Sequence, residues 1–117
     1  MGLLQEKRWT CPMRTFPRAL AKFRRIVDER GRRLRQKTFA QLKQLANESS
    51  ERITVESRSA TIETIVLPLA SGGLQVVARG FLEHRLMPGK SVAMDGFCKH
   101  PDETITPMTD REFRDFD

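Results

Sequence analysis

A ten-residue segment near the middle of the chain, residues 74–83, has the clearest strand pattern in the sequence. Successive side chains of a β-strand point to opposite faces, so a period of two separates the two faces. One face contains only apolar or small residues, namely Leu74, Val76, Ala78, Gly80 and Leu82. The other face is mixed and contains Gln75, Val77, Arg79, Phe81 and Glu83. We therefore expect the first face to lie on a hydrophobic core and the second face to be half covered.

Strand-like segments on both sides of this one predict an antiparallel meander. The residues before it are rich in Thr, Ile and Val, which favour a pleated surface. Between the two, Gly72 and Gly73 supply the backbone freedom that a tight turn requires. In the segment after it, Val92, Met94, Gly96 and Cys98 share one face. The predicted strands are 53–56, 60–67, 74–83, 91–99 and 104–106.

Helices are predicted before and after the sheet. The first begins at Thr15, which is a good N-cap residue, and ends or bends at Gly31. A second short helix follows the capping-box residues Thr38 and Gln41, and a third follows Thr109. An apolar stripe at helical spacing runs along the first helix and consists of Phe16, Leu20, Phe23, Ile26 and Val27.

These elements predict an α+β fold, in which N-terminal helices precede a four- to five-stranded antiparallel meander and a short C-terminal helix. We divide the chain into an irregular or disordered arm (1–14), a basic amphipathic helix with a hinge (15–37) and a compact α+β domain (38–117). The second helix is expected to cover the sheet. The first helix is expected to stand apart and to pack its apolar stripe against a partner, such as a second copy of the protein. The covering residues are Phe39, Leu42 and Leu45, and the sheet face comprises Ile53, Val55, Ile62, Val66, Leu74, Val76, Ala78, Leu82, Val92 and Met94.

The distribution of charge is strongly asymmetric. Residues 1–45 carry 13 basic and 3 acidic residues, for a net charge of +10. Residues 46–117 carry 8 basic and 12 acidic residues, for a net charge of −4. Clustered Lys and Arg side chains attract phosphates regardless of base sequence, so the basic segment predicts a non-enzymatic nucleic-acid-binding protein. The candidate nucleic-acid-binding residues are Arg24, Arg25, Arg32, Arg33, Arg35 and Lys37.

Other readings of the first helix remain open. It is also consistent with a solvated basic face, or with a helix that lies on an anionic membrane surface. The alternative function is a protein–protein interaction or self-association module, such as a homodimer. In that case the partner-binding residues are those of the apolar stripe, Phe16, Leu20, Phe23, Ile26 and Val27.

An enzyme or a metal protein is less favoured by the sequence. The residues suited to acid–base or nucleophilic chemistry are His84, Cys98 and His100, with Asp95 or Glu83. A structural zinc site requires four ligands, so Cys11 and every other Cys and His would have to converge. We expect no catalytic site, no metal and no cofactor.

A cytoplasmic location is expected. The chain has no apolar run of about 18 residues, which a transmembrane helix requires. Its first seven residues also lack the apolar centre of a signal peptide. The two cysteines are expected to be free thiols, as is usual in a reducing compartment.

Overall fold

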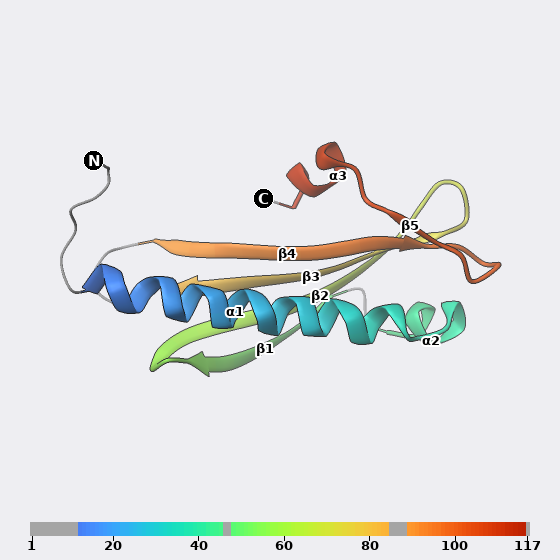
Figure 1. Ribbon diagram of the computed structural model, residues 1–117. Coiled ribbons are helices and arrows are strands. Elements are labelled where there is room, and N and C mark those ends of the chain that lie inside the picture. Colours follow the sequence, from blue (N-terminus) through green and yellow to red (C-terminus); the bar gives the residue numbers. More distant parts are fainter. Residues whose placement is uncertain (1–11, 46–47, 85–88, 117) are drawn as a thin grey trace.

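A computed structural model describes residues 12–45, 48–84 and 89–116, and within them the side chains of 18–45, 49–84 and 89–116. Two helices precede five strands and a closing helix, which confirms the predicted α+β class (Figure 1). The elements are α1 (Pro12–Arg35), α2 (Phe39–Lys43), β1 (Glu48–Val55), β2 (Arg58–Pro68), β3 (Leu74–Glu83), β4 (Lys90–Lys99), β5 (Ile105–Pro107) and α3 (Asp110–Arg114).

The strands form one antiparallel sheet in the order β1-β2-β3-β4-β5, which confirms the predicted meander. A two-residue turn joins β1 to β2, and both its residues, Glu56 and Ser57, have positive φ. Such a turn matches the right-handed twist of the flanking strands. The predicted glycine turn joins β2 to β3, where the Leu69 N–H donates to the Gly73 carbonyl at 2.8 Å. β5 pairs only with residues 97–99 of β4.

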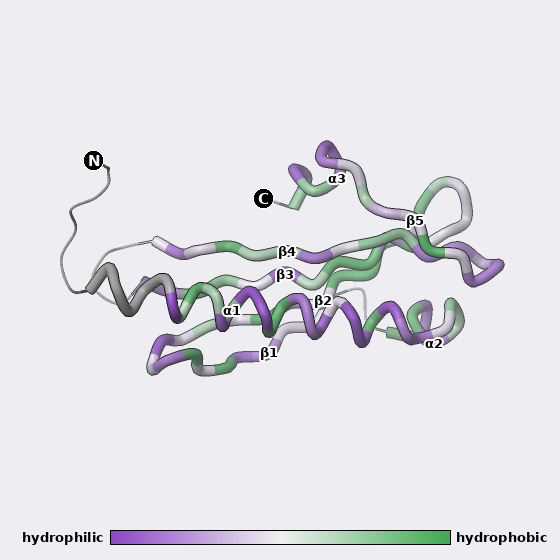
Figure 2. Tube along the Cα trace, in the orientation of Figure 1, coloured by the Kyte–Doolittle hydropathy of each residue, from purple (hydrophilic) through white to green (hydrophobic). Residues whose placement is uncertain are grey.

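α1 lies lengthwise on one face of the sheet, mainly over β3 and β4 (Figure 1). Its apolar residues alternate with hydrophilic ones along the helix (Figure 2), and Phe23 and Val27 are fully buried. Our expectation that α1 stands apart is therefore wrong. The predicted residues of the second helix do join the same core, with Leu42 buried and Phe39 and Leu45 partly buried beside it, but the five-residue α2 is too short to cover a long sheet. The helix with the longer stripe buries more apolar area and occupies the face.

The boundaries of α1 also differ from the prediction. The helix begins at Pro12 rather than Thr15, and it continues through Gly31 to Arg35. Gly31 is buried, and a Cβ atom at this position would meet the Asp95 carboxylate of β4. Gly31 therefore allows close approach of helix and sheet and does not end the helix. The part of the predicted N-terminal arm before residue 12 lies outside the described residues.

The register of β4 shows that two of its residues were predicted on the wrong face of the sheet. Leu82 pairs with Ser91 and Gly80 pairs with Ala93, so Asp95 and Phe97 face α1. Val92 and Met94 consequently lie on the opposite face, and Val92 is exposed. The other residues predicted on the α1-facing side of the sheet lie there, fully or partly buried.

The opposite face of the sheet is covered at one end by α3, which packs Phe113 and Phe116 against a small buried cluster. The predicted capping box is present, since the Thr109 hydroxyl accepts from the Glu112 N–H and the Glu112 carboxylate accepts from the Thr109 N–H. The same carboxylate accepts from the Gln75 side chain at 2.9 Å. The Thr109 backbone and hydroxyl, followed by Gln75, lower the pKa of Glu112.

We predict that Gly80→Ala destabilises the fold by about 1–3 kcal/mol through overpacking. A Cβ atom on Gly80 would lie 2.7 Å from Phe23 Cζ and 2.8 Å from Val27 Cγ2. Urea unfolding measures the loss. The matched control is the same change in a Phe23→Leu background, which removes the ring and reduces the loss. Unchanged or increased stability of Gly80→Ala would contradict this packing.

We also predict that Glu112 contributes to acid sensitivity. Its pKa is lower in the folded protein than the usual value of 4.5, so its stabilisation is present above about pH 4.5 and is lost as the pH falls further. Glu112→Gln keeps a capping side chain, as Gln41 does in α2. The unfolding curves of the two proteins should therefore differ near neutral pH and converge in acid. A difference that is constant with pH would contradict this role.

Candidate nucleic-acid interface

A groove runs along one flank of α1 and has a volume of about 370 Å³. Its lining residues recur every three or four positions, so they share one side of the helix. α1 packs mainly on β3 and β4, and this leaves its flank toward β1 less covered. We call this the basic groove, and its residues are Lys22, Arg25, Ile26, Glu29, Arg30 and Arg33.

Two of the four cations of the basic groove are paired with acids from β1 and its turn. Lys22 Nζ lies 3.1 Å from Glu56 Oε2, and Arg30 Nη2 donates to Glu51 Oε1 at 2.5 Å. Arg30 also contacts the Thr64 hydroxyl at 3.5 Å. These contacts connect the groove to the sheet edge and neutralise half of its positive charge.

The other two cations point into solvent. Arg25 is exposed, and the described part of the chain provides no ion-pair partner for it. The side chain of Arg33 is 66 % exposed, and its Nε lies 3.7 Å from Glu29 Oε1. An exposed contact of this length contributes little free energy. Arg25 and Arg33 are therefore the cations that an anionic ligand meets first.

The structure does not place the six predicted nucleic-acid-binding residues on one surface. Arg25 and Arg33 line the basic groove. Arg24 is exposed outside the groove, and Arg32 is exposed and paired with Glu29. Lys37 is half-buried, in the turn after α1. The sixth residue, Arg35, is directed toward β4 and not toward the basic groove.

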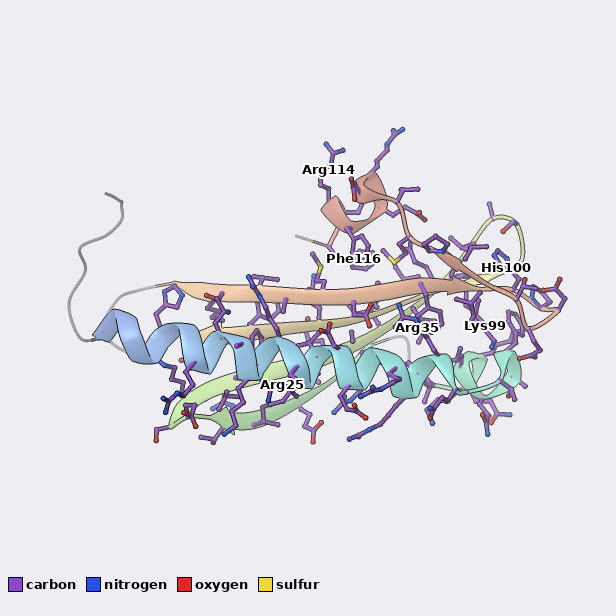
Figure 3. All side chains as sticks on the ribbon, viewed as in Figure 1. Arg25, Arg35, Lys99, His100, Arg114 and Phe116 are labelled. Carbon is purple, nitrogen blue, oxygen red and sulfur yellow. The ribbon has the colours of Figure 1, made fainter. Side chains whose placement is uncertain are left out.

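Arg35 anchors the end of α1 to β4. Its guanidinium donates two hydrogen bonds to the Asp95 carboxylate, at 2.7 and 2.9 Å, and lies 4.9 Å from the centre of the Phe97 ring. The hydrogen bond to Asp95 raises the pKa of Arg35. In Figure 3, Arg35 points toward β4, away from the flank of α1 that carries Arg25. Its bidentate pairing with Asp95 gives Arg35 a structural role within the fold.

The predicted partner-binding stripe is largely occupied within the chain. Phe23 and Val27 are fully buried against the sheet, and Leu20 and Ile26 are partly buried beside them. Phe16 lies in α1, but its side chain is outside the described ones. The described part of the stripe is thus largely covered by the sheet of the same chain.

Lys22, Glu29 and Arg30 line the basic groove but were not among the site residues predicted from the sequence. They could have been predicted from the sequence, because their spacing relative to Arg25 and Arg33 places all five residues on one flank of a helix. The pairing of Arg30 with Glu51 and of Lys22 with Glu56 joins positions 21 and 34 residues apart. Helical spacing alone gives no sign of such long-range pairs.

The candidate catalytic and metal-binding residues that the structure describes do not converge, and Cys11 lies outside the described residues. His84 follows β3 at one end of the sheet and contacts Ser91 Oγ at 3.0 Å. His100 follows β4 at the other end and contacts Thr106 Oγ1 at 3.0 Å. Burial, and then the nearby Glu112 carboxylate, raise the pKa of the Cys98 thiol, which disfavours a nucleophilic thiolate. Within residues 12–45, 48–84 and 89–116, no group of three or more Cys, His, Asp or Glu is arranged to hold a metal ion.

Comparison with known proteins gives no relative, since no protein-family model, curated protein or solved structure matches the chain. None of the helices in the described ranges is long and apolar enough to cross a membrane. The function is therefore inferred from the residues of the basic groove alone.

We predict that the Arg35–Asp95 pair stabilises the fold cooperatively. Asp95→Asn and Arg35→Gln should each lower the free energy of unfolding by about 1–2 kcal/mol, because each leaves a partly buried group without its partner. The double variant should lose less than the sum of the two single losses. Urea unfolding of all four proteins measures this coupling, and strictly additive losses would rule it out.

Proposed function

We propose that this protein binds nucleic acid by contacting the phosphate backbone through the basic groove of α1. The observation that carries the proposal is the composition of the groove, whose six lining residues include four cations and one acid. Arginine presents a planar fork of N–H donors that matches phosphate oxygens, and its charge persists at every physiological pH.

The rigidity of α1 supports this proposal. The helix has 24 residues, and its buried face is fixed on the sheet by Phe23, Val27 and Leu34. The Arg35–Asp95 pair holds its C-terminal end. A fixed helix sets the spacing of its cations before binding, so only their side chains, and not the backbone, lose conformational freedom when they contact phosphates.

The chemistry of the groove favours binding that is independent of base sequence. No aromatic side chain lines it within the described residues, so it offers no surface on which bases could stack. Its one apolar member, Ile26, packs against the core of the protein. Phosphate contacts position a protein on nucleic acid but do not read sequence.

We predict that Arg25→Glu/Arg33→Glu strongly weakens binding to a generic 20-base-pair DNA duplex at low salt. Both side chains are exposed, so the fold should be unaffected. Fluorescence anisotropy over a range of salt concentrations measures the affinity, and single-stranded RNA serves as a second ligand. Reversing two contacting charges should also reduce the steepness of the salt dependence.

The matched control is Arg111→Glu/Arg114→Glu, which changes the net charge by the same amount. These two arginines are exposed on α3, on the opposite side of the sheet from α1 (Figure 1). The control should retain most of the binding. Equal losses in the two double variants would mean that net charge alone governs binding, and the proposal would be withdrawn. Failure of the unmodified protein to bind either nucleic acid at low salt would have the same consequence.

A further inference from the structure

The two exposed cations of the basic groove are far apart along α1. Arg25 and Arg33 are separated by eight residues, which corresponds to a rise of about 12 Å along an α-helix. Both side chains are exposed on the same flank of the helix, so each can bind its own anionic group. A ligand that carries anionic groups repeated along its length can therefore contact both arginines at once.

The other two cations of the basic groove are paired with carboxylates: Lys22 with Glu56, and Arg30 with Glu51. Lys22 and Arg30 would otherwise extend the row of positive charge along the same flank. Glu51 is exposed at the edge of the sheet, and Glu56 is exposed in the two-residue turn after β1. A carboxylate that already pairs with a cation competes with an incoming phosphate for the same donors. It also repels that phosphate directly.

From these contacts we infer that the basic groove selects a polyanionic backbone that bridges Arg25 and Arg33, and that Glu51 and Glu56 limit the number of phosphates it contacts. This inference rests on the proposed function and adds to it the class of ligand and the residues that set its affinity. In the unmodified protein the groove contributes two phosphate contacts. Without the two acids, Lys22 and Arg30 contribute two more.

The salt dependence of duplex binding counts these contacts. Each phosphate contact with B-DNA adds about −0.9 to the slope of the logarithm of the binding constant against the logarithm of salt concentration. Arg25→Gln and Arg33→Gln should each make the slope shallower by about 0.9. Arg24→Gln is the matched control, because Arg24 is exposed on the same helix but lies outside the groove. Its slope should stay close to that of the unmodified protein.

Neutralising the two acids is the decisive experiment. Glu51→Gln/Glu56→Gln should tighten binding and steepen the slope by up to about 1.8, as Lys22 and Arg30 become available. Adding Lys22→Gln/Arg30→Gln to this variant should abolish that increase. The charge-matched control is Glu83→Gln/Asp115→Asn, which removes two exposed acids outside the basic groove. This control should leave the slope unchanged.

Inorganic phosphate tests the preference for a repeated anion. At constant ionic strength it should displace the duplex no better than chloride does, because a single phosphate lacks the repeated anionic groups with which a duplex contacts both arginines. Displacement by phosphate alone would overturn the inference, as would an unchanged slope in Glu51→Gln/Glu56→Gln. If Arg25→Gln and Arg33→Gln also leave the slope unchanged, the proposed function fails together with the inference. If only the acid variants lack an effect, the proposed function stands and this inference is wrong.

Discussion

The packing of the α1 apolar stripe on the sheet is the interaction on which the rest of the structure depends. Phe23 and Val27 fill the space above Gly80, the one position of β3 on this face that has no side chain. Because the helix settles into this hollow, it comes close enough to β4 for Gly31 to pack beside Asp95. The location of the helix thus follows from a glycine in the sheet facing an aromatic ring in the helix. Hydrophobic burial supplies the driving force.

The same packing decides where the charges go. A helix with one face buried must carry its basic residues on its two flanks and its outer side, and the two flanks of α1 have different neighbours. On the flank toward β4, Arg35 is fixed by Asp95 and by the ring of Phe97. On the flank toward β1, a less covered region leaves room for the basic groove. A sequence that is uniformly basic along the helix therefore becomes a structural anchor on one side and a solvent-facing groove on the other.

Local patterns in the sequence were sufficient for the order of the strands, the turn at Gly72 and the capping boxes at Thr38 and Thr109, but they began the first strand at residue 53 and β1 begins at Glu48. They did not show that α1 covers the sheet, because both helices carry apolar residues at helical spacing. The longer stripe of α1 and the space above Gly80 that receives Phe23 and Val27 decide this in the structure. They also assigned Met94 to the core face, because Val92 and Met94 share one face at period two. In the structure the partly buried Asp95 faces α1 instead, where a cation pairs with it. That cation, Arg35, lies 60 residues away in the chain. For the site, the sequence predicted a basic helix, but the pairing of its groove cations depends on residues 21 and 34 positions away.

The unequal lengths of β4 and β5 have a consequence for aggregation. Since β5 pairs only with residues 97–99, the described part of the chain leaves the earlier portion of β4 as an open sheet edge. Open edges invite pairing with strands of other molecules, and natural proteins protect them with charges, including charges that point inward. Asp95 is such a charge, and Lys90 stands at the start of the same edge. The carboxylate that fixes the end of α1 is thus also an inward-pointing charge of the kind that disfavours strand addition at a sheet edge.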